Sequence, residues 1–60
     1  MKMIPREEVL SVANAMIQYG GSFVKALGKA LSHADWINQQ KIKNTWPEYW
    51  QQYKNMGEKE

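Results

Sequence analysis

The sequence predicts an all-α fold, a small bundle of three short helices, or of four if residues 35–44 are helical. Apolar residues recur at intervals of three and four along most of the chain, which is the period of an amphipathic helix. Proline and glycine fall where helices begin and end, and short corners between the helical stretches favour antiparallel neighbours. With 60 residues and no cysteine, the chain forms one domain without disulfide or thiolate-metal support. We expect an ordered core over residues 4–56 and a frayed tail over residues 57–60.

The first predicted helix begins beside Pro5, because the first turn of a helix tolerates proline. Glu7 and Glu8 follow, where the helix dipole favours negative charge. Its apolar residues keep the helical spacing and include Val9, Val12, Ala13 and Met16, with Leu10 and Ile17 widening the apolar arc. Gly20-Gly21 ends this helix, since glycine accepts the left-handed conformation of a C-cap.

The second predicted helix has Ser22 as its N-cap. Its apolar side carries Phe23, Val24, Leu27, Ala30, Leu31 and Ala34, and its polar side carries Lys25, Lys29 and Ser32. Gly28 lies in the middle, where glycine costs about 1 kcal/mol relative to alanine. Either the helix tolerates this cost, or a neighbouring backbone packs closely against Gly28.

Residues 35–44 fit either a short helix or a loop. Asp35 can cap a helix whose first turn holds Trp36 and Ile37. The middle of the stretch is polar, however, and it ends just before Pro47, which biases Trp46 away from helical geometry. The sequence leaves this choice open.

An aromatic stripe marks the last predicted helix. Its rings lie three and four residues apart on one helical face: Trp46, Tyr49, Trp50 and Tyr53. Thr45 and Glu48 are spaced for a reciprocal capping box, and Gly57 is the expected end of the helix. The stripe is expected to be mainly core, because the chain has little else to fill its interior. Any ring left outside would mark a surface for a protein partner or for self-association.

Composition excludes several classes of protein. The hydrophobic content of 43% and the charged content of 23% are those of a globular rather than a disordered chain. No stretch approaches the roughly 20 apolar residues of a membrane span. The N-terminus becomes acidic where a signal peptide would need its apolar core. We therefore expect a cytoplasmic protein that does not contact membranes.

Few residues are available for catalysis. His33 is the only histidine, and the chain has no cysteine with which to form a nucleophile or a metal site. We expect His33 to face solvent or to lie at a helix end, where the dipole suits its partial charge. Gly20-Gly21-Ser22 lacks the further glycine and the Lys-Ser/Thr pair of a phosphate-binding loop. The sequence therefore predicts no enzyme activity, no cofactor, no metal and no small-molecule substrate.

Lysines provide an alternative hypothesis. The chain has a net charge of +2, and four lysines could share one face: Lys25, Lys29, Lys41 and Lys43. Such a face could bind the phosphates of a nucleic acid. The stretch that would serve as a recognition helix lacks arginine, however, and offers only Asn38, Gln39 and Gln40 to base edges. A solvated lysine face is the favoured interpretation, and nucleic-acid binding is the alternative.

A Gly-Gly-Ser corner, an Ala-Asp step and a Pro-Glu-Tyr-Trp segment follow one another over residues 19–28, 30–35 and 41–53. In this order they resemble a group of small proteins encoded in bacteriophage and prophage genomes. The resemblance covers about residues 17–53. It implies a phage setting in a bacterial host and no catalytic residues, because the group has no assigned activity. We therefore expect a phage or prophage accessory protein that acts through protein–protein contact, with self-association as one form of that contact.

Overall fold

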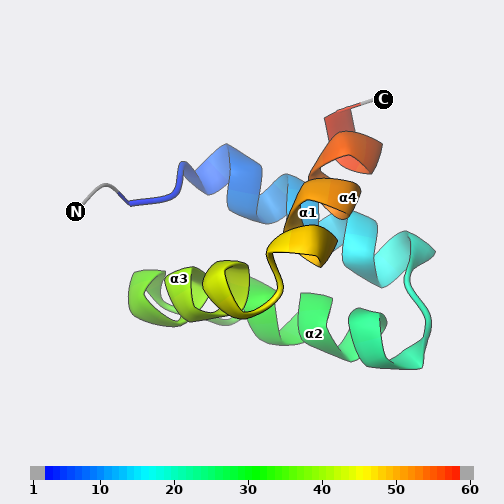
Figure 1. The fold of residues 1–60 in the computed structure, drawn as a ribbon, viewed down its shortest axis with the longest axis horizontal. Helices are drawn as coiled ribbons and strands as arrows, with labels where there is room; N and C mark the ends of the chain where they lie inside the picture. The colour runs from blue at the N-terminus through cyan, green and yellow to red at the C-terminus, as the bar shows by residue number, and fades with distance from the viewer. Residues whose placement is uncertain (1–2, 59–60) are drawn as a thin grey trace.

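The computed structural model describes residues 3–58, which form four α-helices and no strand (Figure 1). The helices are α1 (Arg6–Tyr19), α2 (Ser22–Ser32), α3 (Trp36–Thr45) and α4 (Pro47–Glu58). The prediction of an all-α bundle is confirmed, and the stretch that the sequence left open is helical from Trp36 onward. None of the described helices has the length and apolarity that crossing a membrane requires.

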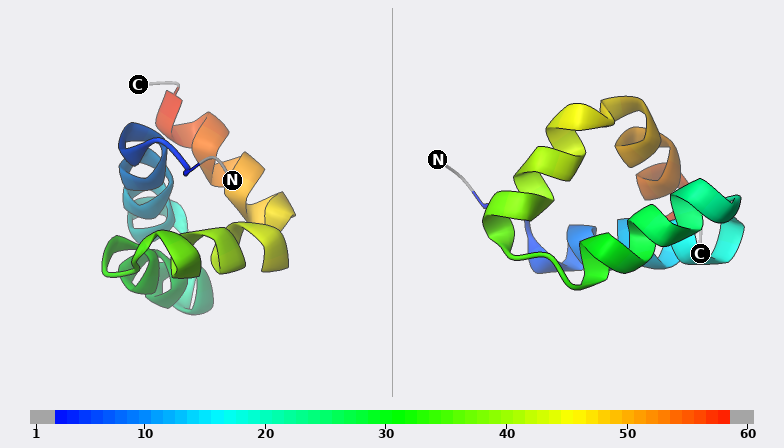
Figure 2. Two further views of the ribbon diagram at one scale, coloured as in Figure 1. Left: turned by 90° about the vertical axis from the view of Figure 1, so that its left-hand side faces the viewer. Right: turned by 90° about the horizontal axis from the view of Figure 1, so that it is seen from below.

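The core is built around α1. Figures 1 and 2 show α2 running back alongside α1, α4 lying across α1, and α3 linking the far end of α2 to the start of α4. The buried hydrophobic side chains are Ile4, Val9, Val12, Ala13, Ala15, Met16, Val24, Leu27, Leu31, Trp50 and Tyr53. Five of them belong to α1 and none belongs to α3, so α1 is the element on which α2 and α4 pack.

The apolar arcs of α1 and α2 are narrower than the sequence predicted. Leu10, Phe23 and Ala30 are exposed, so their assignment to the apolar sides of these helices was wrong. The buried side of α2 is limited to the narrow strip over Val24, Leu27, Gly28 and Leu31, the side that packs on α1. Phe23 precedes Val24 by one residue, a rotation of about 100°, which carries its ring to the edge of that strip.

The corner between α1 and α2 also differs from the prediction. Gly20 has φ −79° and Gly21 has φ −72°, so neither adopts the left-handed conformation that the sequence suggested. Ser22 is the first residue of α2 and not its cap. Glycine is needed at position 20 for space, because a Cβ there would lie 2.6 Å from the Met16 carbonyl oxygen and from Val24 Cγ1.

The start of α3 follows the prediction. The backbone N–H of Asn38 donates to Asp35 Oδ1 at 2.9 Å, so Asp35 caps α3 as expected. The Asp35 carboxylate therefore has a structural role as a helix cap.

The α3–α4 junction does not form the predicted capping box. Thr45 is the last residue of α3, and Trp46, with φ −127° and ψ 63°, separates the two helices. The Trp46 N–H still donates to the Ile42 carbonyl at 3.0 Å, which extends α3 by one residue beyond the expected end. Trp46 is non-helical, as expected for the residue before Pro47.

The end of α4 extends beyond the predicted stop. Gly57 lies inside the helix, close against Ser11 of α1, and α4 continues to Glu58. Residues 59–60 of the predicted tail lie outside the described residues.

The surroundings of Gly28 explain why a glycine lies at the centre of α2. A Cβ at this position would lie 2.7 Å from Met16 Cβ and 2.9 Å from the Ala13 carbonyl oxygen. Both atoms belong to or lie next to the α1 backbone, so neither can swing away. Close packing between α1 and α2 is the reason for this glycine.

Gly28→Ala should therefore destabilise the protein, although alanine normally favours helix by about 1 kcal/mol. The added methyl group must push α1 and α2 apart, and overpacking of this kind costs about 1–3 kcal/mol. Urea melts followed by circular dichroism would measure the change. Gly21→Ser is the control, since the space around Gly21 is open and a serine there can cap α2, adding a few tenths of a kcal/mol. A Gly28→Ala melt at or above that of the natural chain would contradict the close packing.

Trp50→Ala should unfold the monomer, because the Trp50 side chain is 2% exposed at the centre of the α1–α4 contact. Replacing a buried tryptophan with alanine costs about 3–5 kcal/mol, as much as a core of this size supplies. Trp36→Ala is the control, since Trp36 is 41% exposed and its removal should change the urea midpoint little. An unchanged melt for Trp50→Ala would reject the place of Trp50 in the core.

Candidate interaction surface

The aromatic stripe of α4 divides into a buried part and a half-buried part. Trp50 and Tyr53 are 2% and 7% exposed and belong to the core, which confirms the core interpretation for these two rings. Trp46 and Tyr49 pack against the core but remain partly accessible. Of the four rings that the sequence offered to a partner, Trp46 and Tyr49 are therefore the ones within reach of a partner of the folded chain.

Phe23 joins these two rings from the first turn of α2. Its ring meets Trp46 edge to face, with centroids 5.9 Å apart and planes at 68°, and lies 6.4 Å from the Tyr49 centroid. Contacts of this geometry are favourable beyond the area that they bury. Phe23 is nevertheless 56% exposed, so the residue contacts both rings and still presents much of its surface to solvent. We call Phe23, Trp46 and Tyr49 the aromatic surface.

A second cluster of side chains centres on the carboxylate of Glu8, which joins α1, α3 and α4. The Trp50 indole Nε1–H donates to Glu8 Oε2 at 2.8 Å. Lys43 Nζ lies 3.4 Å from the same oxygen, and Lys54 Nζ lies 3.7 Å from Glu8 Oε1. Lys43 Nζ is also 5.6 Å from the centroid of the Trp50 ring, within the range of a cation–π contact. This cluster fixes the orientation of α4 relative to α1.

Opposing effects act on the Glu8 carboxylate. Burial raises its pKa, since the side chain is only 17% exposed, but the Trp50 hydrogen bond and the two lysines lower the pKa by more. The net effect is a pKa below the ordinary value of a glutamate. Glu8 is therefore an ionised structural group whose oxygens face three donors, which does not suit it to exchange protons with a substrate.

The four lysines of the alternative hypothesis do not lie in equivalent settings. Lys25, Lys29 and Lys41 are exposed, whereas Lys43 is partly buried and pairs with Glu8. Because Glu8 neutralises much of the Lys43 charge, the hypothesis of a nucleic-acid surface rests on the other three lysines.

The groups considered for chemistry lie apart from one another. His33 is exposed and forms the C-cap of α2, where the sequence placed it. Within residues 3–58, no three side chains of the His, Cys, Asp or Glu type gather in a way that could hold a metal ion.

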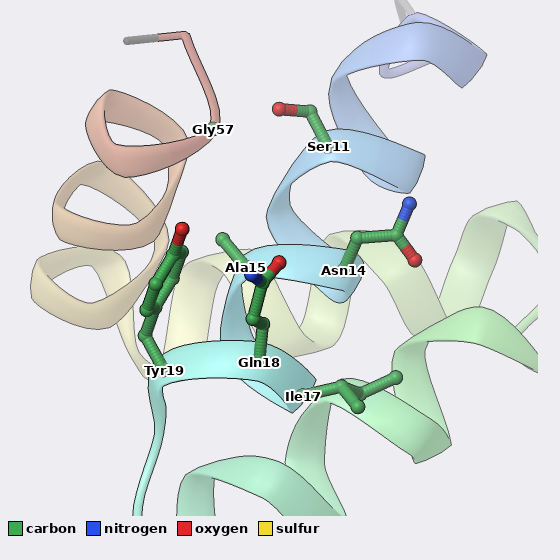
Figure 3. A pocket seen from close by; sticks show the side chains of 7 residues that line it. All are labelled: Ser11, Asn14, Ala15, Ile17, Gln18, Tyr19 and Gly57. Carbon is green, nitrogen blue, oxygen red and sulfur yellow. The ribbon is translucent and has the colours of Figure 1, made fainter. Parts of the chain in front are cut away.

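A hollow of about 460 Å³ lies between α1 and the end of α4 (Figure 3). It is lined by Ser11, Asn14, Ala15, Ile17, Gln18, Tyr19 and Gly57. In Figure 3 the Ser11 side chain points toward the end of α4, whereas the Asn14 amide points away from it. All these side chains are uncharged, and they do not converge on one point.

A smaller hollow of about 370 Å³ adjoins the aromatic surface. It lies over the first two turns of α4 and is lined by Thr45, Trp46, Glu48, Tyr49 and Gln52. We call it the α4 pocket. It shares Trp46 and Tyr49 with the aromatic surface and adds an exposed carboxylate, Glu48. The aromatic surface and the α4 pocket together make this side of the molecule the candidate interaction surface.

The spacing of residues along the chain predicted only part of this candidate interaction surface. The three-and-four spacing of the α4 rings identified Trp46 and Tyr49, but the sequence indicated for Phe23 only a place on the apolar side of the second helix. No local signal identified the role of Glu8, because Lys43 and Trp50 lie 35 and 42 residues further along the chain.

No protein-family model matches the chain, and comparisons with curated proteins and with solved structures find no match either.

Glu8→Gln should remove the two ion pairs while leaving an oxygen that can accept the Trp50 hydrogen bond. We expect a loss of about 1 kcal/mol at neutral pH, since both lysines are partly solvated. Glu8→Leu should cost about 1–3 kcal/mol more, because it leaves the buried indole N–H without an acceptor.

The same variants test the pH dependence. The pKa of Glu8 is lower in the folded than in the unfolded chain, so its stabilisation is complete above the unfolded value and is lost as the pH falls through the folded value. Urea melts between about pH 6 and pH 2 should show this loss in the natural chain and less of it in Glu8→Gln. Glu7→Gln, an exposed neighbour, is the control. Equal pH profiles for the two glutamine variants would contradict the role of Glu8.

Proposed function

We propose that this chain is a non-enzymatic accessory protein of a phage or prophage that acts through protein–protein contact, by self-association through the aromatic surface. The observation that carries the proposal is the position of Phe23. A phenylalanine that is 56% exposed while its ring contacts Trp46 and Tyr49 presents a preformed apolar site. Clusters of large rings are typical anchors of protein interfaces.

Self-association suits this surface for two physical reasons. An uncharged cluster of rings can pair with its own copy about a two-fold axis, because such pairing brings no like charges together. A chain of 60 residues without disulfides has a small core, and oligomerisation is a usual source of further stability. A standard interface covers about 800 Å² on each partner, roughly a fifth of the 4322 Å² that this chain exposes.

The setting in the proposal rests on the resemblance over residues 17–53 to small proteins of phage and prophage genomes. It places the protein in the cytoplasm of a bacterial host. The absence of catalytic activity in the proposal rests on the sequence, with its single histidine and no cysteine. A turnover activity of the purified chain would overturn that part.

Phe23→Ala should weaken self-association at least about fivefold, since truncating an aromatic anchor costs more than about 1 kcal/mol of binding. Because Phe23 contributes little to the core, the urea midpoint should fall by less than that of Trp50→Ala. Size-exclusion chromatography with light scattering, over a range of protein concentrations, would measure the dissociation constant.

Trp36→Ala is the matched control for Phe23→Ala. Trp36 is also an exposed ring in the first turn of a helix, but it lies at the far end of α3 from Trp46, ten positions or about 15 Å of helix away. Its removal should leave the dimer intact. A natural chain that stays monomeric at every concentration would refute self-association. Co-elution of that monomer with DNA at low salt and release at high salt would favour the alternative based on Lys25, Lys29 and Lys41.

A further inference from the structure

We propose that the α4 pocket binds a single cationic side chain, the ammonium group of a lysine or the guanidinium group of an arginine, presented by a partner protein. The inference rests on the proposed function in that the ligand belongs to a protein. It names a separate contact beside the aromatic surface, with its own ligand chemistry.

The walls of the α4 pocket have the composition of a site for an organic cation. Trp46 and Tyr49 supply two aromatic rings, Glu48 supplies a carboxylate, and Gln52 supplies an amide that can accept a hydrogen bond. A ring face attracts a cation held within about 6 Å of its centroid, and tryptophan does so most strongly. The same chemistry already occurs in this fold, where Lys43 Nζ lies 5.6 Å from the Trp50 centroid beside the carboxylate of Glu8. The α4 pocket offers the ring and the carboxylate but has no lysine of its own lining it.

The charge of Glu48 is available to such a ligand. Among the described residues, the two lysines that pair with a carboxylate both use Glu8, and Glu48 forms no ion pair. The helical positions from which a lysine would neutralise Glu48 hold Gln51 and Gln52, three and four residues further along α4. Glu48 is also exposed, so a partner can reach it without unfolding the chain.

Backbone electrostatics at this junction do not oppose a cation. The start of α4 carries partial positive charge, which Glu48 in its first turn offsets. The end of α3 carries partial negative charge, and Thr45, its last residue, lines the α4 pocket. Pro47 has no N–H to donate to the Lys43 carbonyl, so the end of α3 keeps an oxygen without its helical donor.

The dimensions favour a side chain of a protein over a larger ligand. A volume of about 370 Å³ lies at the low end of the range for ligand pockets, and the hollow is open to solvent. Its place next to the aromatic surface allows a partner that covers Phe23 to insert one basic side chain beside Trp46. The uncharged rings would then supply contact area, while the α4 pocket would select a partner with a lysine or arginine at that position.

The test uses the full chain labelled with nitrogen-15 and two capped tripeptides, acetyl-Gly-Lys-Gly-amide and acetyl-Gly-norleucine-Gly-amide. Norleucine keeps the apolar stem of lysine but lacks the charge. We expect the lysine peptide to shift the Trp46 indole signal and the backbone signals of Glu48 and Tyr49 in a saturable way. The norleucine peptide should not. Glu48→Gln should weaken the binding of the lysine peptide by about twofold to fivefold, because it removes an exposed ion pair and leaves both rings in place.

Glu7→Gln is the matched control, because Glu7 is also an exposed carboxylate in the first turn of a helix. It should bind the lysine peptide as the natural chain does. Equal shifts with both peptides, or unchanged binding by Glu48→Gln, would overturn the proposal. Loss of a dimer in Glu48→Gln without any peptide binding would also overturn it and would identify a second copy of this chain as the occupant.

The outcomes separate this inference from self-association. A monomer that binds the lysine peptide at the α4 pocket supports the site and refutes self-association. A dimer that depends on Phe23 but ignores the lysine peptide supports self-association and refutes the cationic ligand.

Discussion

The hydrogen bond from the Trp50 indole to Glu8 is the contact on which the arrangement of the helices depends. Trp50 is the largest fully buried side chain in the core. Without an acceptor for its indole N–H, the cost of burying that polar group would offset much of the free energy gained by burying the ring. Glu8 supplies that acceptor from the first turns of α1. A carboxylate in this position needs compensating charge in turn, and Lys43 from α3 and Lys54 from α4 provide it. Each polar group of this cluster thus needs a partner that a different helix supplies.

This dependence explains how a chain with so small a core can hold four helices in one arrangement. Apolar contact brings α1, α2 and α4 together, because these three contribute the buried residues of the helices. α3 has no buried residue and joins the bundle through the partly buried Ile42 and through Lys43, which pairs with Glu8. Polar contacts therefore position the one helix that the hydrophobic effect leaves least constrained.

Local patterns in the sequence predicted what depends on neighbours along the chain. The helical class, the cap at Asp35 and the core positions of Trp50 and Tyr53 all follow from spacings of three and four residues. The exposure of Phe23 could not be predicted, because it depends on which helix covers each side of α2. The place of Gly20 followed from the space beside Met16 and not from its backbone angle. The role of Glu8 depends on partners more than thirty residues away, and no short-range pattern in the sequence indicates such pairs.

The absence of buried side chains in α3 has a consequence for the dynamics of the bundle. A helix with little buried area opens locally at low cost, so the backbone amides of α3 should exchange with deuterium sooner than those of α1. Trp46 follows the last residue of α3, and its N–H bonds to Ile42 inside that helix. Each opening of α3 therefore disturbs one wall of the candidate interaction surface. A partner that holds Trp46 in place would slow exchange along the whole of α3, well beyond the residues that it touches.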